Sequence, residues 1–223
     1  MRLGEAMVSP DSYGSVFLLI VATYAVSVSL SRSWAGSIVV AVQIATVWVV
    51  LRVSQARRGY RRLASVLLVV SATVALVNLF TGDSRASLGV ITATSALLYL
   101  VAPFAILRHL LLRDVIDRET MVGAIDAYLL IGMFFALVYR FLGVAGGSAF
   151  FGAGGDGTIA QDFFFSFTTL TTTGYGNLVP AANPGQTLAV IEMLVGQLFL
   201  ILTIGKVVTA WRPSVRPRGP GPS

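Results

Sequence analysis

Cysteine is absent from the 223 residues, charged side chains make up only 12% of them, and histidine occurs once. The lack of cysteine excludes disulfide bonds and thiolate metal sites. Globular chains carry about 25% charged residues, so the low charge and the 56% hydrophobic content indicate an integral membrane protein. No His, Cys and carboxylate cluster, phosphate loop or nucleophile–base set occurs, so an enzyme is the weakest interpretation. We expect no catalytic residues and no organic cofactor.

Long apolar runs occupy most of the chain. A helix that crosses a bilayer needs about 20 residues. Runs near that length cover residues 12–31, 33–51, 63–80, 86–107, 121–139 and 186–208. A signal peptide is the alternative for the first run, but Arg2 is offset by Glu5 and no clear cleavage site follows. We predict an all-α membrane protein with six transmembrane helices.

The net charge is +6, and the basic residues gather beside the apolar runs. Six spans place both termini on one side, together with the arginines of residues 52–62 and 108–118 and the basic tail. Basic segments favour the cytoplasm, so both termini are predicted to be cytoplasmic, in the plasma membrane. The charge is thus assigned to topology and to anionic lipids at the cytoplasmic face, with no nucleic acid partner. The glycine-rich residues 143–157 predict an exposed loop on the other side.

A short polar stretch between the last two runs contains Thr172, Thr173, Gly174, Tyr175 and Gly176. A dehydrated cation needs a cage of oxygen atoms that replaces its water shell. Successive backbone carbonyls point the same way only if alternate residues take opposite-handed dihedrals, and glycine takes positive φ without steric cost. The two glycines alternate with Thr173 and Tyr175, and the Thr172 hydroxyl adds an oxygen. One strand supplies one side of a cage, so several chains must meet on an axis.

The run Thr-Thr-Thr-Gly-Tyr-Gly at residues 171–176 resembles the signature of potassium channels. The resemblance implies a homotetramer that conducts K⁺ passively, with K⁺ held by residues 172–176 as the permeant ion. It also implies an outer helix, a re-entrant pore helix, a selectivity filter and an inner helix within residues 119–210. We expect the pore helix at 163–171, with Asp162 or Thr158 as its polar start. Gly196 is expected to be a hinge for gating in the inner helix, with close helix packing as the alternative.

The surroundings of the filter depart from the family in two ways. Phe164 and Phe165 stand where many relatives have tryptophan, which can donate a hydrogen bond toward Tyr175. Thr168 and Asn177 stand where some relatives place a pair of carboxylates. We therefore expect selectivity to be intact, and the stability of the filter and filter-based gating to differ from the family.

Three ionisable residues lie inside predicted spans. Asp126 and Lys206 lie near the cytoplasmic ends of the fifth and sixth spans, where they either pair or reach headgroups and water. Glu192 lies in the outer half of the last span, within reach of Arg140 or of polar groups behind the pore helix. A structural brace is the role that we expect for Glu192.

The chain divides into four predicted parts. These are a four-helix transmembrane domain at residues 1–107, an interfacial linker helix at 108–120, a pore domain at 121–210 and a disordered basic tail at 211–223. The first part has the position of a voltage sensor, but residues 86–107 contain no arginine. Because one charge that crosses the membrane contributes only about 2.3 kcal/mol per 100 mV, we expect weak voltage dependence. A potassium-selective channel is the leading hypothesis. A poorly selective cation channel and a non-conducting regulatory subunit are the alternatives.

Overall fold

The computed structural model describes residues 13–29, 45–53, 58–81, 84–111, 118–146 and 148–210. All the regular structure in these residues is helical, and residues 45–53 form one short helical segment. The other helices are α1 (Tyr13–Ser29), α3 (Arg58–Thr81), α4 (Arg85–Leu111), α5 (Arg118–Ala145), α6 (Ile159–Leu170) and α7 (Gly185–Ala210), with a 3₁₀ turn η1 at Gly152–Gly154.

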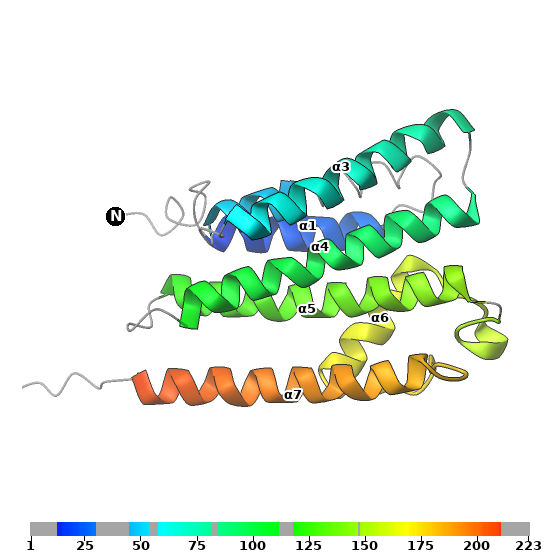
Figure 1. The fold of residues 1–223 in the computed structure, drawn as a ribbon. Coiled ribbons are helices and arrows are strands. Elements are labelled where there is room, and N and C mark those ends of the chain that lie inside the picture. Colours follow the sequence, from blue (N-terminus) through cyan, green and yellow to red (C-terminus); the bar gives the residue numbers. More distant parts are fainter. Residues whose placement is uncertain are drawn as a thin grey trace, which may run out of the picture.

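The long helices run side by side, and the short helix α6 lies obliquely between α5 and α7 (Figure 1). The start of α1 and the end of α7 lie at the same end of the bundle (Figure 1). Three stretches are long and apolar enough to cross a membrane, and they are Arg85–Arg108, Glu119–Ala145 and Gly185–Lys206. Shorter apolar stretches cover Tyr13–Ser27 and Arg62–Val74. The chain is therefore an all-helical membrane protein in its described part, with three spans of full length where the sequence predicted six.

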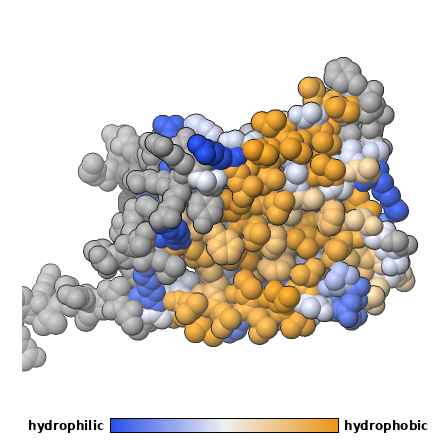
Figure 2. All heavy atoms as spheres, in the orientation of Figure 1, coloured by the Kyte–Doolittle hydropathy of each residue, from blue (hydrophilic) through white to orange (hydrophobic). Residues whose placement is uncertain are grey.

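Apolar residues cover the middle of the bundle on the face shown in Figure 2, and polar residues lie toward its two ends. This belt is what a bilayer requires, since side chains that face lipid tails must be apolar. Some of the buried polar side chains bond to one another across neighbouring helices. Thr23 and Thr46 hydroxyls lie 3.2 Å apart, and those of Ser71 and Thr94 lie 2.6 Å apart. Such hydrogen bonds join neighbouring helices inside a membrane.

Helix α4 packs more extensively against α5 than any other pair of helices does in the described residues. Helix α4 continues to Leu111 and α5 begins at Arg118, so the predicted linker segment 108–120 is shared between two long helices. The remaining residues of that segment, 112–117, lie outside the described residues. A connection this short makes consecutive helices antiparallel neighbours. Helix α4 therefore lies directly on α5 of its own chain.

Helix α1 contacts both α5 and α6. Its first backbone N–H, at Tyr13, donates to the Glu119 carboxylate at the start of α5 over 3.0 Å. Further along α1, the ring of Tyr24 meets Phe163 and Phe167 of α6 edge-on, with ring centroids 5.6 Å and 5.9 Å apart. The first helix is thus part of the packing around α6.

The glycine-rich loop after α5 is only partly exposed, so the prediction of an exposed loop at 143–157 is wrong for its centre. Helix α5 continues to Ala145, and Phe150 and Phe151 are buried in one cluster with Tyr139 and Phe165. The Phe150 carbonyl also accepts a hydrogen bond from the backbone N–H of Ala181, over 2.9 Å. Burial of two adjacent phenylalanines stabilises the fold by about 2–3 kcal/mol each, which is why the loop folds back onto α6.

Candidate ion-conduction site

Helix α6 begins with a capping box. The Thr158 hydroxyl accepts a hydrogen bond from the backbone N–H of Gln161, and the Gln161 side chain accepts one from the backbone N–H of Thr158. This arrangement satisfies two backbone donors that a helix start leaves free. Of the two predicted polar starts, Thr158 is the one used, and Asp162 lies inside the helix. The helix therefore starts four residues earlier than the predicted 163–171.

The polar stretch after α6 alternates between left-handed and ordinary backbone. The φ angles of Thr172, Gly174 and Gly176 are 56°, 55° and 78°, while Thr173 and Tyr175 do not have positive φ. Alternation of this kind is what the sequence predicts for a strand whose carbonyls point to one side. Glycine takes such angles freely, but a β-branched residue does so at a cost of about 1–3 kcal/mol. Thr172 thus stores backbone strain at the inner end of the stretch.

Backbone hydrogen bonds attach this stretch to the end of α6. The Thr168 carbonyl accepts from the N–H groups of both Thr173 and Gly174, over 2.8 Å and 3.1 Å. The Thr173 hydroxyl lies 2.9 Å from that of Thr171. Thr168 therefore supports the stretch through its backbone, at a position where some potassium channels have a carboxylate.

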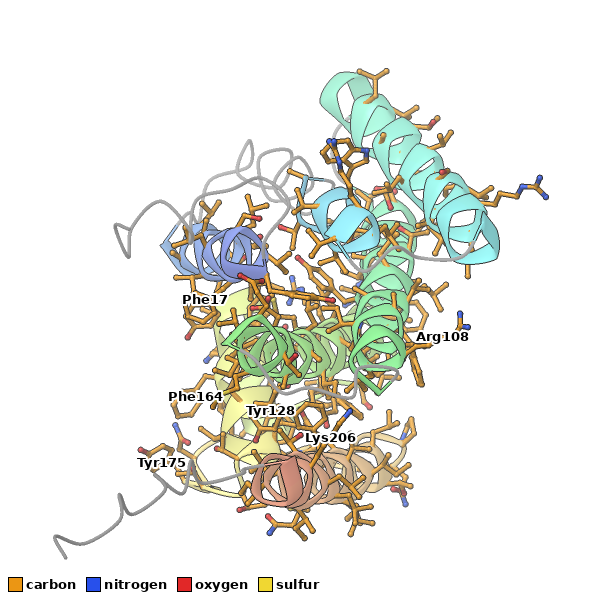
Figure 3. All side chains as sticks on the ribbon, turned by 90° about the vertical axis from the view of Figure 1, so that its left-hand side faces the viewer. Phe17, Arg108, Tyr128, Phe164, Tyr175 and Lys206 are labelled. Atoms are coloured by element: carbon orange, nitrogen blue, oxygen red, sulfur yellow. The ribbon has the colours of Figure 1, made fainter. Side chains whose placement is uncertain are left out.

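The four phenylalanines of α6 pack in different directions. Phe163 and Phe165 are buried, and Phe167 is half-buried against Gly132 of α5. Phe164 is 37% exposed and stacks on Tyr175, with ring centroids 5.8 Å apart and an interplanar angle of 14°. The two side chains project from the same edge of the molecule (Figure 3). The sequence showed that Phe164 could not donate a hydrogen bond to Tyr175, but not that it would stack on it.

A buried polar cluster, called here the Glu192 cluster, lies behind the stretch and consists of Gly132, Tyr139, Ser166 and Glu192. The Tyr139 hydroxyl donates to Glu192 Oε2 over 2.6 Å. Ser166 Oγ lies 2.5 Å from Glu192 Oε1 and 2.7 Å from the Gly132 carbonyl oxygen. The three side chains are fully buried. Of the two predicted partners of Glu192, polar groups behind α6 are the ones observed. The sequence could not name these partners, because they come from three helices. It could have shown only that Gly132 and Tyr139, seven residues apart, lie on one face of the same helix.

Arg140 contacts the other end of α6. Its guanidinium donates to the Gly157 carbonyl over 2.7 Å and lies 3.8 Å from a carboxylate oxygen of Asp162. Both Asp162 oxygens are buried and accept no hydrogen bond from the described residues. Burial raises the pKa of Asp162 to about 7, although Arg140 lowers it, and nearby Asp156 raises it further. Asp156 itself pairs with Arg85 over 3.4 Å.

Gly196 of α7 passes close to the end of α6. A Cβ atom at this position would lie 2.3 Å from the Leu170 carbonyl oxygen and 2.9 Å from a methyl carbon of the same residue. The Leu170 carbonyl also accepts a hydrogen bond from the Tyr128 hydroxyl of α5, over 3.2 Å, and Tyr128 projects from α5 toward α7 (Figure 3). Helix α7 is continuous through Gly196. This geometry favours the packing alternative, and the role of Gly196 in gating stays a prediction.

The predicted pair between Asp126 and Lys206 is not formed in the described structure. Asp126 is fully buried, and neither of its oxygens accepts a hydrogen bond from the described residues. Lys206 lies near the end of α7 and is half-buried.

A comparison with known families found a match, and it covers the part of the chain that contains α6 and the polar stretch. Residues 124–212 match the model of a family described as "Ion channel". The matched segment contains nearly all of α5, all of α6, the polar stretch and α7. The match supports an ion channel, and a transport protein over an enzyme. Comparisons with curated proteins and with solved structures gave no match.

Proposed function

We propose that the protein is a potassium-selective channel that conducts K⁺ passively through a homotetrameric pore in the plasma membrane. The observation that carries the proposal is the alternation of left-handed φ angles at Thr172, Gly174 and Gly176. In this proposal residues 172–176 are the selectivity filter, α5 and α7 are the outer and inner helices, and α6 is the pore helix. Both termini lie in the cytoplasm.

The direction of α6 supports the binding of a cation at the inner end of the filter. Aligned peptide dipoles place partial negative charge at a helix C-terminus. Helix α6 ends at Leu170, two residues before Thr172. A dehydrated cation next to Thr172 would therefore be stabilised by the helix end as well as by the oxygens of the filter.

Exposed surfaces support assembly of several copies. Residues 171–177 are all exposed in the single chain, and Tyr175 is 71% exposed. Helix α7 also presents apolar side chains that nothing in the described chain covers, among them Leu194, Leu198, Ile201 and Leu202. A cage around an ion needs oxygens from several strands. Four chains around one axis would supply them and would cover this face of α7.

Weak voltage dependence is part of the proposal. Helix α4 carries Arg85 in its first turn and Arg108 near its end, with no basic residue between them. It also lies along α5 over a large interface. Steep voltage gating requires several charges that cross the membrane in each subunit. Bilayer recordings in symmetric K⁺ should give a shallow conductance–voltage relation, and a steep one would contradict this part of the proposal.

Ion flux into liposomes that contain the purified protein tests the proposal. Gly174→Ala should abolish K⁺ flux, because left-handed backbone at a non-glycine residue costs about 1–2 kcal/mol and the strand would rearrange. Gly155→Ala is the matched control. Gly155 also has positive φ, at 78°, and a Cβ atom at either glycine would meet no atom within 4 Å. Gly155 also has ψ of −160°, a backbone region that is essentially confined to glycine. The control variant should therefore suffer at least as much local strain as Gly174→Ala and still conduct.

The outcome separates the alternatives. K⁺ flux that Na⁺ does not replace, and that only Gly174→Ala removes, supports the potassium channel. Similar K⁺ and Na⁺ fluxes indicate a poorly selective cation channel. A well-folded protein with no flux at any potential indicates a regulatory subunit.

A further inference from the structure

The Glu192 cluster contains three oxygen–oxygen contacts at hydrogen-bonding distance. They join Tyr139 to Glu192, Ser166 to Glu192 and Ser166 to the Gly132 carbonyl, over 2.6 Å, 2.5 Å and 2.7 Å. Each contact needs one hydrogen atom. Tyrosine and serine hydroxyls supply one each, and the carbonyl supplies none. With Glu192 ionised, two hydrogens serve three contacts, and two oxygens face each other without a hydrogen.

A proton on Glu192 Oε1 removes this deficit. The acid group then donates to Ser166 Oγ, Ser166 donates to the Gly132 carbonyl, and Tyr139 donates to Glu192 Oε2. All three contacts become hydrogen bonds. The buried site favours the same form, because an unpaired carboxylate away from water is costly.

The described surroundings of Glu192 contain no compensating positive charge. From α5, the Tyr139 phenol donates to Glu192, and the Tyr128 phenol lies one helical turn further along α7, where it donates to the Leu170 carbonyl next to Gly196. From α6, the facing group is the hydroxyl of Ser166. Arg140 is directed away, since its guanidinium contacts Gly157 and Asp162.

The cluster also lies on the seam that joins α7 to the base of the filter. Glu192 contacts Ser166, and one helical turn further on Gly196 contacts Leu170. Both pairs are four residues apart along their helices, so they form one row of contacts. A movement of α7 relative to α6 must therefore change the Glu192–Ser166 contact.

We propose that Glu192 is an un-ionised positioning residue that joins the inner helix to the pore helix, and that loss of its proton weakens conduction. Loss of the proton leaves two hydrogen atoms for the three contacts of the Glu192 cluster. Ser166 then bonds either to Glu192 or to Gly132, and α6 is released from one of its two neighbours. The effect on conduction rests on the proposed channel function, whereas the protonation state and the effect on stability do not.

Two substitutions at position 192 test the inference. In Glu192→Gln, the amide N–H₂ can donate to Ser166 and the amide oxygen can accept from Tyr139, so all three bonds persist. In Glu192→Leu, both bonds to residue 192 are lost at similar volume. We expect the leucine variant to melt at a lower temperature and to lose K⁺ flux, because two buried hydrogen bonds are lost and the Tyr139 hydroxyl is left buried without its acceptor. The glutamine variant should restore both quantities.

Infrared spectroscopy reads the protonation state without any ion flux. The wild-type spectrum minus the Glu192→Gln spectrum at neutral pH should contain the carbonyl stretch of an un-ionised carboxyl group. Bands of a carboxylate in that difference would overturn the inference. So would a glutamine variant that melts as low as the leucine variant.

The pH dependence of flux completes the test. Flux through the wild type should fall as the medium becomes alkaline, by more than flux through Glu192→Gln. Asp162 also titrates near neutral pH, in the wild type and in Glu192→Gln alike. The test is therefore the difference between the pH profiles of the two proteins. Equal pH profiles would overturn the regulatory part of the inference. If no variant conducts, the proposed function fails, and the infrared and melting measurements still decide the state of Glu192.

Discussion

Replacement of Gly196 by alanine should lower the stability of the protein and disturb the end of α6. The new Cβ atom would lie 2.3 Å from the Leu170 carbonyl oxygen, whereas ordinary contacts are 3.4–4 Å. The helices must separate by about 1 Å, and overpacking of this kind costs about 1–3 kcal/mol. The opposing gain in helix propensity is at most about 1 kcal/mol. Because Leu170 lies two residues before Thr172, the shift should reach the filter and lower K⁺ selectivity.

Gly205→Ala is the matched control for this prediction. Gly205 lies on the same helix, and a Cβ atom there would meet nothing within 4 Å. Thermal melting of the purified variants measures stability, and reversal potentials under K⁺/Na⁺ gradients measure selectivity. The control should be as stable as the wild type or more so. If Gly196→Ala equals the control in both assays and alters only the open probability, the packing argument is wrong and Gly196 acts as a hinge.

Three further predictions concern α6. The pKa of Asp162 in the folded protein is about 7, above its usual value of 3.8. The wild type should therefore lose folding stability as the pH rises through about 7, because Asp162 is then ionised in its buried site. Asp162→Asn should remove this pH-dependent loss. Melting curves at about pH 5 and pH 8 test this, and an equal loss in the variant would refute it. Phe164→Ala should lower K⁺ selectivity, because the aromatic stack on Tyr175 contributes about 0.5–1.5 kcal/mol. Phe164→Tyr should keep the stack and the selectivity. Equal reversal potentials for the two variants would show that the stack does not support selectivity. Thr158→Ala should destabilise the protein by about 0.5–2 kcal/mol through loss of the N-cap, whereas Thr158→Ser should retain the cap; denaturation of both variants measures the difference, which should be absent if the capping box contributes nothing.

The sequence was sufficient for local features whose cause is local. The sequence prediction named Thr158 as one of two polar starts for α6, and the capping-box spacing to Gln161 is the local signal that would have decided between Thr158 and Asp162. The left-handed angles at Gly174 and Gly176 followed from the need for aligned carbonyls and from the freedom of glycine. The same argument did not reach Thr172, because the intrinsic preference of a β-branched residue opposes the angle that it adopts.

Features that depend on distant residues could not be predicted in detail. Glu192 lies 26 residues from Ser166 and 53 from Tyr139 in the chain, and only the crossing of three helices brings them together. The prediction of an exposed loop at 143–157 relied on its many glycines and gave no weight to the adjacent pair Phe150 and Phe151, which indicates burial. Two large apolar side chains in a loop next to a membrane helix have a reason to be buried, and this reason could have been given from the sequence.

The contact of Tyr24 with Phe163 and Phe167 has a consequence for the modular use of this chain. Residues 118–210 contain the whole candidate pore, which invites their excision as a minimal two-helix channel. Excision would leave an aromatic face of α6 without the helix that covers it in this chain, and an aromatic side chain buries about 150–250 Å² when it is packed. In a bilayer, lipid acyl chains would then contact Phe163 and Phe167, and α6 would lose a fixed packing partner on that side. In this chain α1 therefore supplies, through Tyr24, a fixed packing partner for α6 at a position that lipid would otherwise occupy.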